Sequence, residues 1–243
     1  MAIILFSEKS DGNMGLNVDL DLNEARINRR VFLEKNGFKI ENTFFMNCVH
    51  GTSINLINKV SGDGPVEMDD VDGFITFNPE VVLSFAPADC MPIVFSCVDD
   101  QGVTRGIALI HAGTRGIKHL IAKEATLKIY EAAKQRGINL QRLEVSFLNY
   151  IQSCCYDYYR FDLRTLGMIQ VSTLFNSGSE LRFSDLRWGL SIGNQECTCC
   201  TRGSDGGYKY FSHSRSCNSM NRVSAYPNVD LSPEGRNLVV VGF

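Results

Sequence analysis

Long apolar runs, an excess of basic residues and a basic N-terminal segment are all absent from this sequence. No apolar run approaches the roughly 18 residues that can span a bilayer. Lysine and arginine total 24 against 27 aspartates and glutamates, so a formal net charge of -3 gives no general attraction for nucleic acid or anionic membranes. The start, MAIILFSEKSDG, is only briefly apolar, which predicts a first strand rather than a signal peptide. We therefore expect a cytoplasmic protein.

Histidine is scarce in this chain, whereas cysteine is not: 243 residues include 4 histidines and 9 cysteines. A chain of this length suits one domain, residues 1–243, that buries a sizeable core without disulfides. Because the sequence shows no export signal, the odd number of cysteines favours reduced thiols. Cys48 and Cys97 fall in apolar segments and are expected to be small buried residues.

Short segments rich in valine, isoleucine and phenylalanine alternate with helical patterns. Strands are predicted at residues 3–6, 43–49, 53–60, 74–77, 81–86, 92–97, 106–110, 143–148 and 238–242. Helices are predicted over 21–36, 116–136 and 162–175, and the acidic segment 67–72 is expected to be a surface loop. Many strands are apolar throughout, which indicates burial on both faces. The pattern predicts an α/β fold, a single layered domain with a mixed central β-sheet core and peripheral helices.

Three residues with metal-binding side chains, His50, Cys90 and His111, each follow an apolar, strand-like run at a turn of small residues. Two imidazoles and one thiolate suit zinc, and three protein ligands leave a fourth position open for water or substrate. The spacing matches no short metal-binding motif. Taken alone, these residues would be better explained as two hydrogen-bonded histidines and a buried thiol than as a metal site.

The segments VHGT, ADCMP and HAGTRG, in that order, resemble the laccase-domain family. The resemblance continues through GLNVD, NRR, VDGFIT, SCCYD, FDLR, YFSHSR and EGRNLVVVGF and so covers nearly the whole chain. Members of this family have been labelled multicopper polyphenol oxidases and are also described as zinc-dependent purine nucleoside phosphorylases. The resemblance implies one layered α/β unit in which His50, Cys90 and His111 hold the metal. Thr114 stands where the family usually has tryptophan.

Two further residues are candidates for catalysis. Asp89, next to Cys90, could orient a ligand imidazole or move a proton, although capping of its turn is an equal alternative. Arg115 is expected near the start of the predicted helix 116–136, where free amide groups and a guanidinium suit phosphate. A structural ion pair is the alternative for Arg115.

Family position also suggests four substrate-binding residues: Asn17, Cys155, His213 and Arg215. A turn is an equal alternative for Asn17, and His119 is expected to have no role in the site. Three further cysteines, Cys197, Cys199 and Cys200, resemble half of a zinc knuckle. No second cysteine pair has the matching spacing, so a structural metal site is not expected there.

The function predicted is that of a zinc-dependent purine nucleoside phosphorylase, with purine nucleoside and phosphate as partners and adenosine deamination as an additional activity. A multicopper laccase is excluded, because 4 histidines cannot supply a blue-copper site and a three-copper cluster. Two alternatives stay open. One is a metal-free cysteine hydrolase using Cys90 and His111, and the other is a zinc-binding domain without catalysis.

Overall fold

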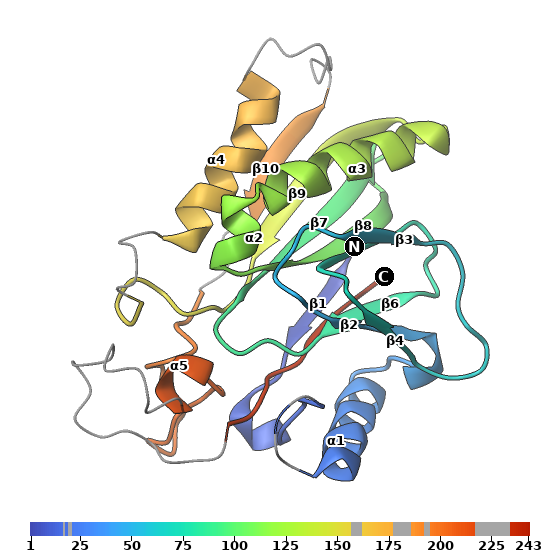
Figure 1. Cartoon of the computed structure of the whole chain (residues 1–243). Helices are drawn as coiled ribbons and strands as arrows, with labels where there is room; N and C mark the ends of the chain where they lie inside the picture. Colours follow the sequence, from blue (N-terminus) through green and yellow to red (C-terminus); the bar gives the residue numbers. More distant parts are fainter. Residues whose placement is uncertain (17, 19–20, 157–161, 177–185, 192–194, 217–233) are drawn as a thin grey trace.

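The computed structural model describes the chain except residues 17, 19–20, 157–161, 177–185, 192–194 and 217–233. Two mixed sheets form its centre (Figure 1). The five-stranded sheet has the order β1 (Ile3–Phe6), β11 (Val239–Gly242), β6 (Val82–Phe85), β2 (Thr43–Asn47) and β4 (Val66–Asp69). The six-stranded sheet has the order β10 (Arg187–Ser191), β9 (Leu140–Phe147), β7 (Met91–Asp99), β8 (Thr104–Ala112), β5 (Gly73–Thr76) and β3 (Ile54–Ile57).

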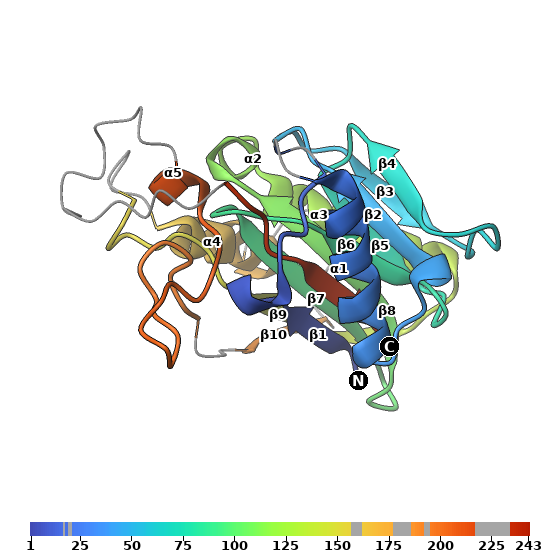
Figure 2. The same ribbon diagram turned by 90° about the horizontal axis from the view of Figure 1, so that it is seen from below.

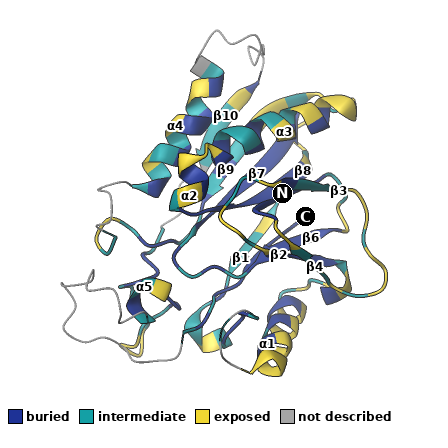
Figure 3. Cartoon of the chain, viewed as in Figure 1, coloured by how far each residue is buried: buried dark blue, intermediate teal, exposed yellow. Residues whose placement is uncertain are grey.

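Four helices cover the outer faces of the two sheets: α1 (Leu22–Lys35), α2 (Thr114–Lys118), α3 (Ile121–Gln135) and α4 (Leu163–Asn176). The short helix α5 (His213–Ser216) lies beside the sheets (Figure 1), and two 3-10 turns are η1 (Lys9–Asp11) and η2 (Ile40–Asn42). One apolar cluster joins α1 to the five-stranded sheet, a second joins the two sheets, and a third joins the six-stranded sheet to α2, α3 and α4. Figure 2 shows α1 lying across its sheet, and Figure 3 shows that the strands between the helices are mostly buried. The molecule is therefore layered as helix, sheet, sheet and helices.

The predicted α/β class is confirmed, but the core contains two sheets where one was expected. The acidic segment 67–72, expected as a loop, begins within β4, an edge strand in which exposed and partly buried residues alternate. The predicted helix 116–136 is divided into α2 and α3, because Leu120 adopts a left-handed conformation with φ 62°. In the described part of the chain, no helix has the length and apolar character that crossing a membrane requires.

Candidate metal centre

Strand pairing brings distant segments together at one end of the six-stranded sheet. Because β7 and β8 are antiparallel, the start of one lies beside the end of the other, with Pro92 opposite His111. Cys90 directly precedes β7 and is thereby placed next to His111. Asp72 directly precedes β5, and its carbonyl accepts a hydrogen bond of 2.8 Å from the His111 amide.

His50 reaches the same place from the loop that leads from β2 in one sheet to β3 in the other. The Asp72 carboxylate accepts hydrogen bonds from the backbone amides of Val49, His50 and Gly51, at 3.2, 2.8 and 2.7 Å. These bonds hold His50 in a left-handed conformation, with φ 61°. One buried carboxylate therefore fixes the whole VHG segment.

The ligand atoms of His50, Cys90 and His111 all lie within 4.8 Å of one another. The Cys90 Sγ is 3.7 Å from the His50 Nε2, and the two imidazole rings meet edge to face with centroids 4.8 Å apart. Gly113 closes the group: a Cβ added there would lie 3.0 Å from the Cys90 Sγ and 3.1 Å from a carbon of the His50 ring. Glycine is therefore the residue that leaves room for this arrangement.

Asp72 also orients the imidazole of His111. Its Oδ1 lies 2.8 Å from the His111 Nδ1, and both side chains are buried. Burial alone would raise the pKa of Asp72, but the hydrogen bonds from His111 and from backbone amides lower it below its ordinary value. An ionised carboxylate only accepts, so the Nδ1 carries a proton, and the Nε2 is the ring nitrogen that could bind a metal once its own proton is lost.

The charges of Cys90 and His111 depend on each other. Burial alone would raise the pKa of the Cys90 thiol, but His111 and His50 together lower it to about 6. Burial would lower the pKa of His111, and Cys48, Cys90 and Asp72 outweigh burial and raise it well above its ordinary value. Near neutral pH Cys90 is therefore a thiolate, the form that binds metal or acts as a nucleophile.

These residues line a cleft of about 1090 Å³, a volume at the upper end for small-molecule sites. Arg115 also lines the cleft, and within the described residues its side chain makes no hydrogen bond or ion pair. The expectation that Arg115 begins a long helix is wrong, because α2 has only five residues. Two further arginines line the cleft: Arg29 is paired with Glu67 at 2.8 Å, and Arg236 is paired with Glu234 at 2.6 Å.

Asp89 lies in the cleft wall. Among the residues that the structure describes, it makes no hydrogen bond to either imidazole. Its carboxylate accepts from the Thr198 hydroxyl at 2.8 Å and from the Ser214 amide at 2.7 Å. The imidazole-orienting position considered for Asp89 is held by Asp72. Asp89 joins the turn before Cys90 to two distant segments instead.

The proposed substrate-binding residues are divided between the cleft and its surroundings, and Asn17 lies outside the described residues. His213 lines the cleft, with its Nδ1 2.7 Å from Glu234. Arg215 is buried and donates to the carbonyls of three residues, Thr198, Cys199 and Tyr210. The predicted pocket role of Arg215 is therefore replaced by a structural one, since its guanidinium is already used. Cys155 belongs to a group of cysteines described below.

Several functional candidates were missed by sequence reasoning. Asp72, in VDGFIT, was visible only as an acidic residue before a strand. Cys48 was expected to be buried, but it is partly exposed and lines the cleft, with its sulfur within 4.8 Å of His111 and Asp72. Cys97 is buried as expected. The hydroxyls of Tyr156 and Thr114, two residues that line the cleft, are hydrogen-bonded at 2.7 Å. Thr114, which stands where the family usually has tryptophan, therefore has a specific partner.

Residues 7–162 match the family described as multi-copper polyphenol oxidoreductase laccase. The chain belongs to this family. The matched region contains β2 to β9 and all three of the clustered ligand residues. The family resemblance inferred from the short segments is thereby confirmed.

Curated relatives carry phosphorylase names. The chain is 27% identical over 187 residues to a purine nucleoside phosphorylase of Corynebacterium glutamicum, covering 75% of this chain and 73% of that protein. It is 35% identical over 109 residues to purine nucleoside phosphorylase YlmD of Geobacillus stearothermophilus, where the match covers 43% of this chain and 38% of the relative. It is 34% identical over 103 residues to a purine nucleoside phosphorylase of Borreliella burgdorferi, covering 42% of this chain and 41% of that protein.

Two solved structures share the fold. The crystal structure of YlmD from Geobacillus stearothermophilus superposes with a TM-score of 0.70 at 23% identity, covering 99% of this chain and 91% of that chain. The Bacillus licheniformis hypothetical protein YfiH gives a TM-score of 0.69 at 18% identity, covering 100% and 92%. The similarity extends over the full layered architecture.

Proposed function

We propose that residues 1–243 form a single domain that acts as a zinc-dependent purine nucleoside phosphorylase, with adenosine, inosine, guanosine and methylthioadenosine as its candidate substrates. The observation that carries this proposal is the group of His50, Cys90 and His111 in the wall of a cleft that is large enough for a nucleoside and phosphate together and that Arg115 also lines. The phosphorylase names of the curated relatives support the same activity.

The three ligand residues have the chemistry that zinc requires. Two imidazole nitrogens and a thiolate are borderline-soft ligands, and three protein ligands are typical of an open, catalytic site. The Asp72–His111 pair is the kind of carboxylate–imidazole contact that orients metal ligands, and Gly113 keeps the space between the ligands clear. When bound, zinc acts as a Lewis acid toward an oxygen at its open position.

Phosphate binding and the positioning of the site are assigned to side chains of the protein. In phosphorolysis a phosphate oxygen forms a bond to the anomeric carbon, the bond from that carbon to the purine nitrogen breaks, and the base leaves with a proton. The Arg115 guanidinium is available to bind two phosphate oxygens at once. Asp89 is assigned a positioning role, because each of its oxygens accepts a structural hydrogen bond, one from Thr198 and one from Ser214.

Adenosine deamination is a narrower extension of this proposal, supported by a metal position that water can also occupy. The names of these relatives concern phosphorolysis alone. A metal-free cysteine hydrolase is the main competing function, since Cys90 has a lowered pKa and lies 3.7 Å from an imidazole nitrogen of His50. Metal dependence separates these functions.

The test is a nucleoside panel incubated with and without phosphate and resolved by chromatography. We expect free base and ribose 1-phosphate to form only when phosphate is present, with activity lost on chelation and restored by zinc. His50→Ala should abolish turnover. His119→Ala is the matched control, because His119 is exposed and lies outside the residues that line the cleft. Phosphate-independent turnover by folded, metal-free protein would contradict the proposal and favour the hydrolase.

A further inference from the structure

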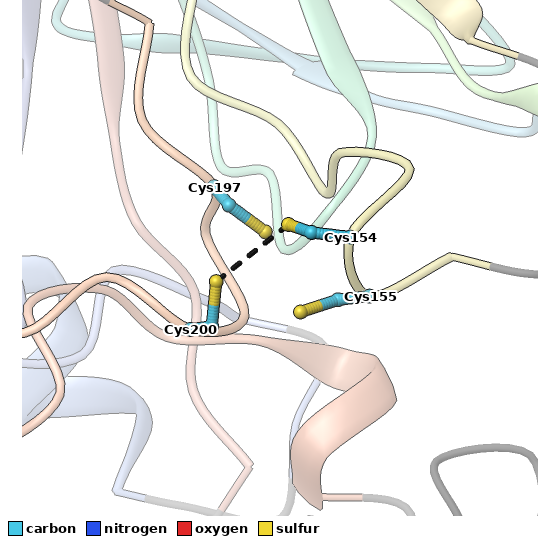
Figure 4. Close-up of side chains that lie close together, drawn as sticks. All are labelled: Cys154, Cys155, Cys197 and Cys200. Atoms are coloured by element: carbon cyan, nitrogen blue, oxygen red, sulfur yellow. Dashed lines mark hydrogen bonds between the residues drawn. The ribbon is translucent and has the colours of Figure 1, made fainter. Parts of the chain in front are cut away.

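Four cysteines form a second group of metal-binding side chains, apart from the cleft. Cys154 and Cys155 lie in the loop after β9, and Cys197 and Cys200 lie in the loop after β10. The expectation that no structural metal site exists here rested on the absence of a second cysteine pair with knuckle spacing. The fold instead brings a vicinal pair and a C-x-x-C pair together, and Figure 4 shows their sulfur atoms facing one another.

The distances among these thiols are those of a metal site. The four sulfur atoms all lie within 4.8 Å of one another, and the Cys154 and Cys200 sulfurs are 3.7 Å apart. A tetrahedral zinc ion with bonds of about 2.3 Å holds its sulfur ligands about 3.8 Å apart. A disulfide requires about 2.05 Å, and none of the four cysteines forms a disulfide in the structure.

We propose that Cys154, Cys155, Cys197 and Cys200 bind one structural zinc ion. Four thiolates complete a tetrahedral shell and leave no position for substrate, which distinguishes a structural site from a catalytic one. The location agrees with this role, because among the described residues none of the four cysteines lines the cleft. Zinc is favoured over harder cations by the all-sulfur ligand set.

The backbone around the cysteines is arranged to support such a site. The Gln152 amide donates to the Cys197 sulfur at 3.4 Å, so the loop after β9 is bonded directly to one of the thiols of the other loop. The Thr198 amide donates to the Tyr150 carbonyl at 3.0 Å, and Gln152 reaches the Gln195 carbonyl at 3.0 Å. The two loops are thus already aligned, and the buried side chain of Ile151 packs against the cysteines.

The four-cysteine group also contacts the cleft wall through its neighbours in sequence. Thr198, between two of the cysteines, donates to Asp89, which precedes Cys90. Tyr156, next to Cys155, bonds Thr114 in the cleft. A zinc ion at the four thiols would therefore hold in place two of the segments that shape the cleft without contacting substrate.

The first experiment counts zinc in purified variants by elemental analysis. The double variant Cys197→Ser, Cys200→Ser should lose about one zinc per chain relative to the wild type, whatever metal the cleft holds. Cys199→Ala is the matched control: this buried cysteine lies in the same loop, is not among the four, and should leave the zinc count unchanged. An equal zinc count in the double variant and the wild type would overturn the proposal, as would iron in place of zinc.

A second experiment uses the wild-type chain and does not depend on the variants folding. Alkylation followed by peptide mass mapping should find the four thiols protected in zinc-loaded protein and labelled together after chelation. Cobalt exchanged into the site should show the absorption of thiolate-bound cobalt, and its loss in the double variant would assign the band to these residues. Labelling that requires a reductant would reveal disulfides, and labelling unaffected by zinc would show that no metal binds. Either result contradicts the proposal.

Discussion

The two cysteine-containing groups of this protein differ in what surrounds them. His50, Cys90 and His111 are held by strand ends and by a buried carboxylate, and they face a cleft. The four-cysteine group joins two loops, packs against Ile151 and is not among the residues that line that cleft. The comparison teaches that the number and type of ligands follow the local architecture. A rigid sheet edge can present three ligands and keep a position open, whereas loops are stabilised by a closed shell of four.

The largest expected effect separates the two groups by function and by stability. Cys90→Ser replaces a soft charged ligand by a neutral hydroxyl, so zinc should leave the cleft and phosphorolysis should fall to background. The melting temperature should change little, because the sheets hold this site. The double variant Cys197→Ser, Cys200→Ser should show the opposite pattern: a clear fall in melting temperature and a smaller loss of phosphorolysis. Calorimetry and activity assays on both variants check this prediction, and equal destabilisation by the two would contradict it.

Removal of the Arg115 guanidinium tests which part of the cleft binds phosphate. Arg115→Ala should slow phosphorolysis and raise the phosphate requirement, because a charge-assisted bond worth about 1.5–3 kcal/mol is lost, or roughly ten- to a hundredfold. Adenosine deamination, where present, uses water and should decline less. Arg30→Ala is the control, since Arg30 is exposed on α1 and does not line the cleft. An equal loss of both activities, with zinc retained, would direct the search for the anion site to Arg236.

A smaller change tests the carboxylate behind His111. Asp72→Asn keeps the shape of the side chain but removes the charge that orients the imidazole and stabilises the proton on its Nδ1. Residues in this position typically contribute about 10–100-fold to metal affinity or activity. We expect a loss of that size in zinc affinity, measured by competition with a chelator, with the four-cysteine group unaffected. Unchanged affinity would show that the backbone contacts of Asp72 are its whole contribution.

The pH dependence of zinc affinity tests the protonation states assigned to the ligands in the cleft. Cys90 has a pKa lowered to about 6, so its thiolate is present above that pH and is lost below it. His111 has a raised pKa and holds a proton near neutral pH that zinc must displace. Zinc affinity should therefore fall by about tenfold per pH unit between about pH 6 and 7 and more steeply below about pH 6. Chelator competition in the double variant Cys197→Ser, Cys200→Ser isolates this site, and a constant slope through pH 6 would contradict the assignment.

Much of the architecture could be predicted from sequence, because buried strands have strongly apolar sequences. The first strand was predicted with its exact bounds, and the other predicted strands overlap β2, β3, β5, β6, β7, β8, β9 and β11. The edge strand β4 was missed because acidic residues rarely favour strands, and β10 gave no clear pattern. The break at Leu120 was missed because its apolar side chain continues the helical periodicity, and only the backbone shows the left-handed turn.

The site was predictable where chemistry is local and unpredictable where it depends on pairing between distant segments. His50, Cys90 and His111 were identified from their residue types and the strand-like runs before them. Asp72 could not be assigned because its partner is 39 positions away, across the β5–β8 pairing. The same limit hid the four-cysteine group, since Cys154 and Cys200 are separated by 46 positions. Strand and loop contacts, rather than spacing along the chain, create both groups.

The most direct test of the difference between the two groups is a zinc titration of metal-stripped wild-type protein that follows activity and melting temperature in parallel. Four thiolates should bind zinc more tightly than two imidazoles and one thiolate. The first zinc ion bound per chain should therefore raise the melting temperature without restoring activity. The second zinc ion should restore phosphorolysis with little further stabilisation. Activity and stability that return together with a single equivalent would contradict the division between an open catalytic centre and a closed structural one.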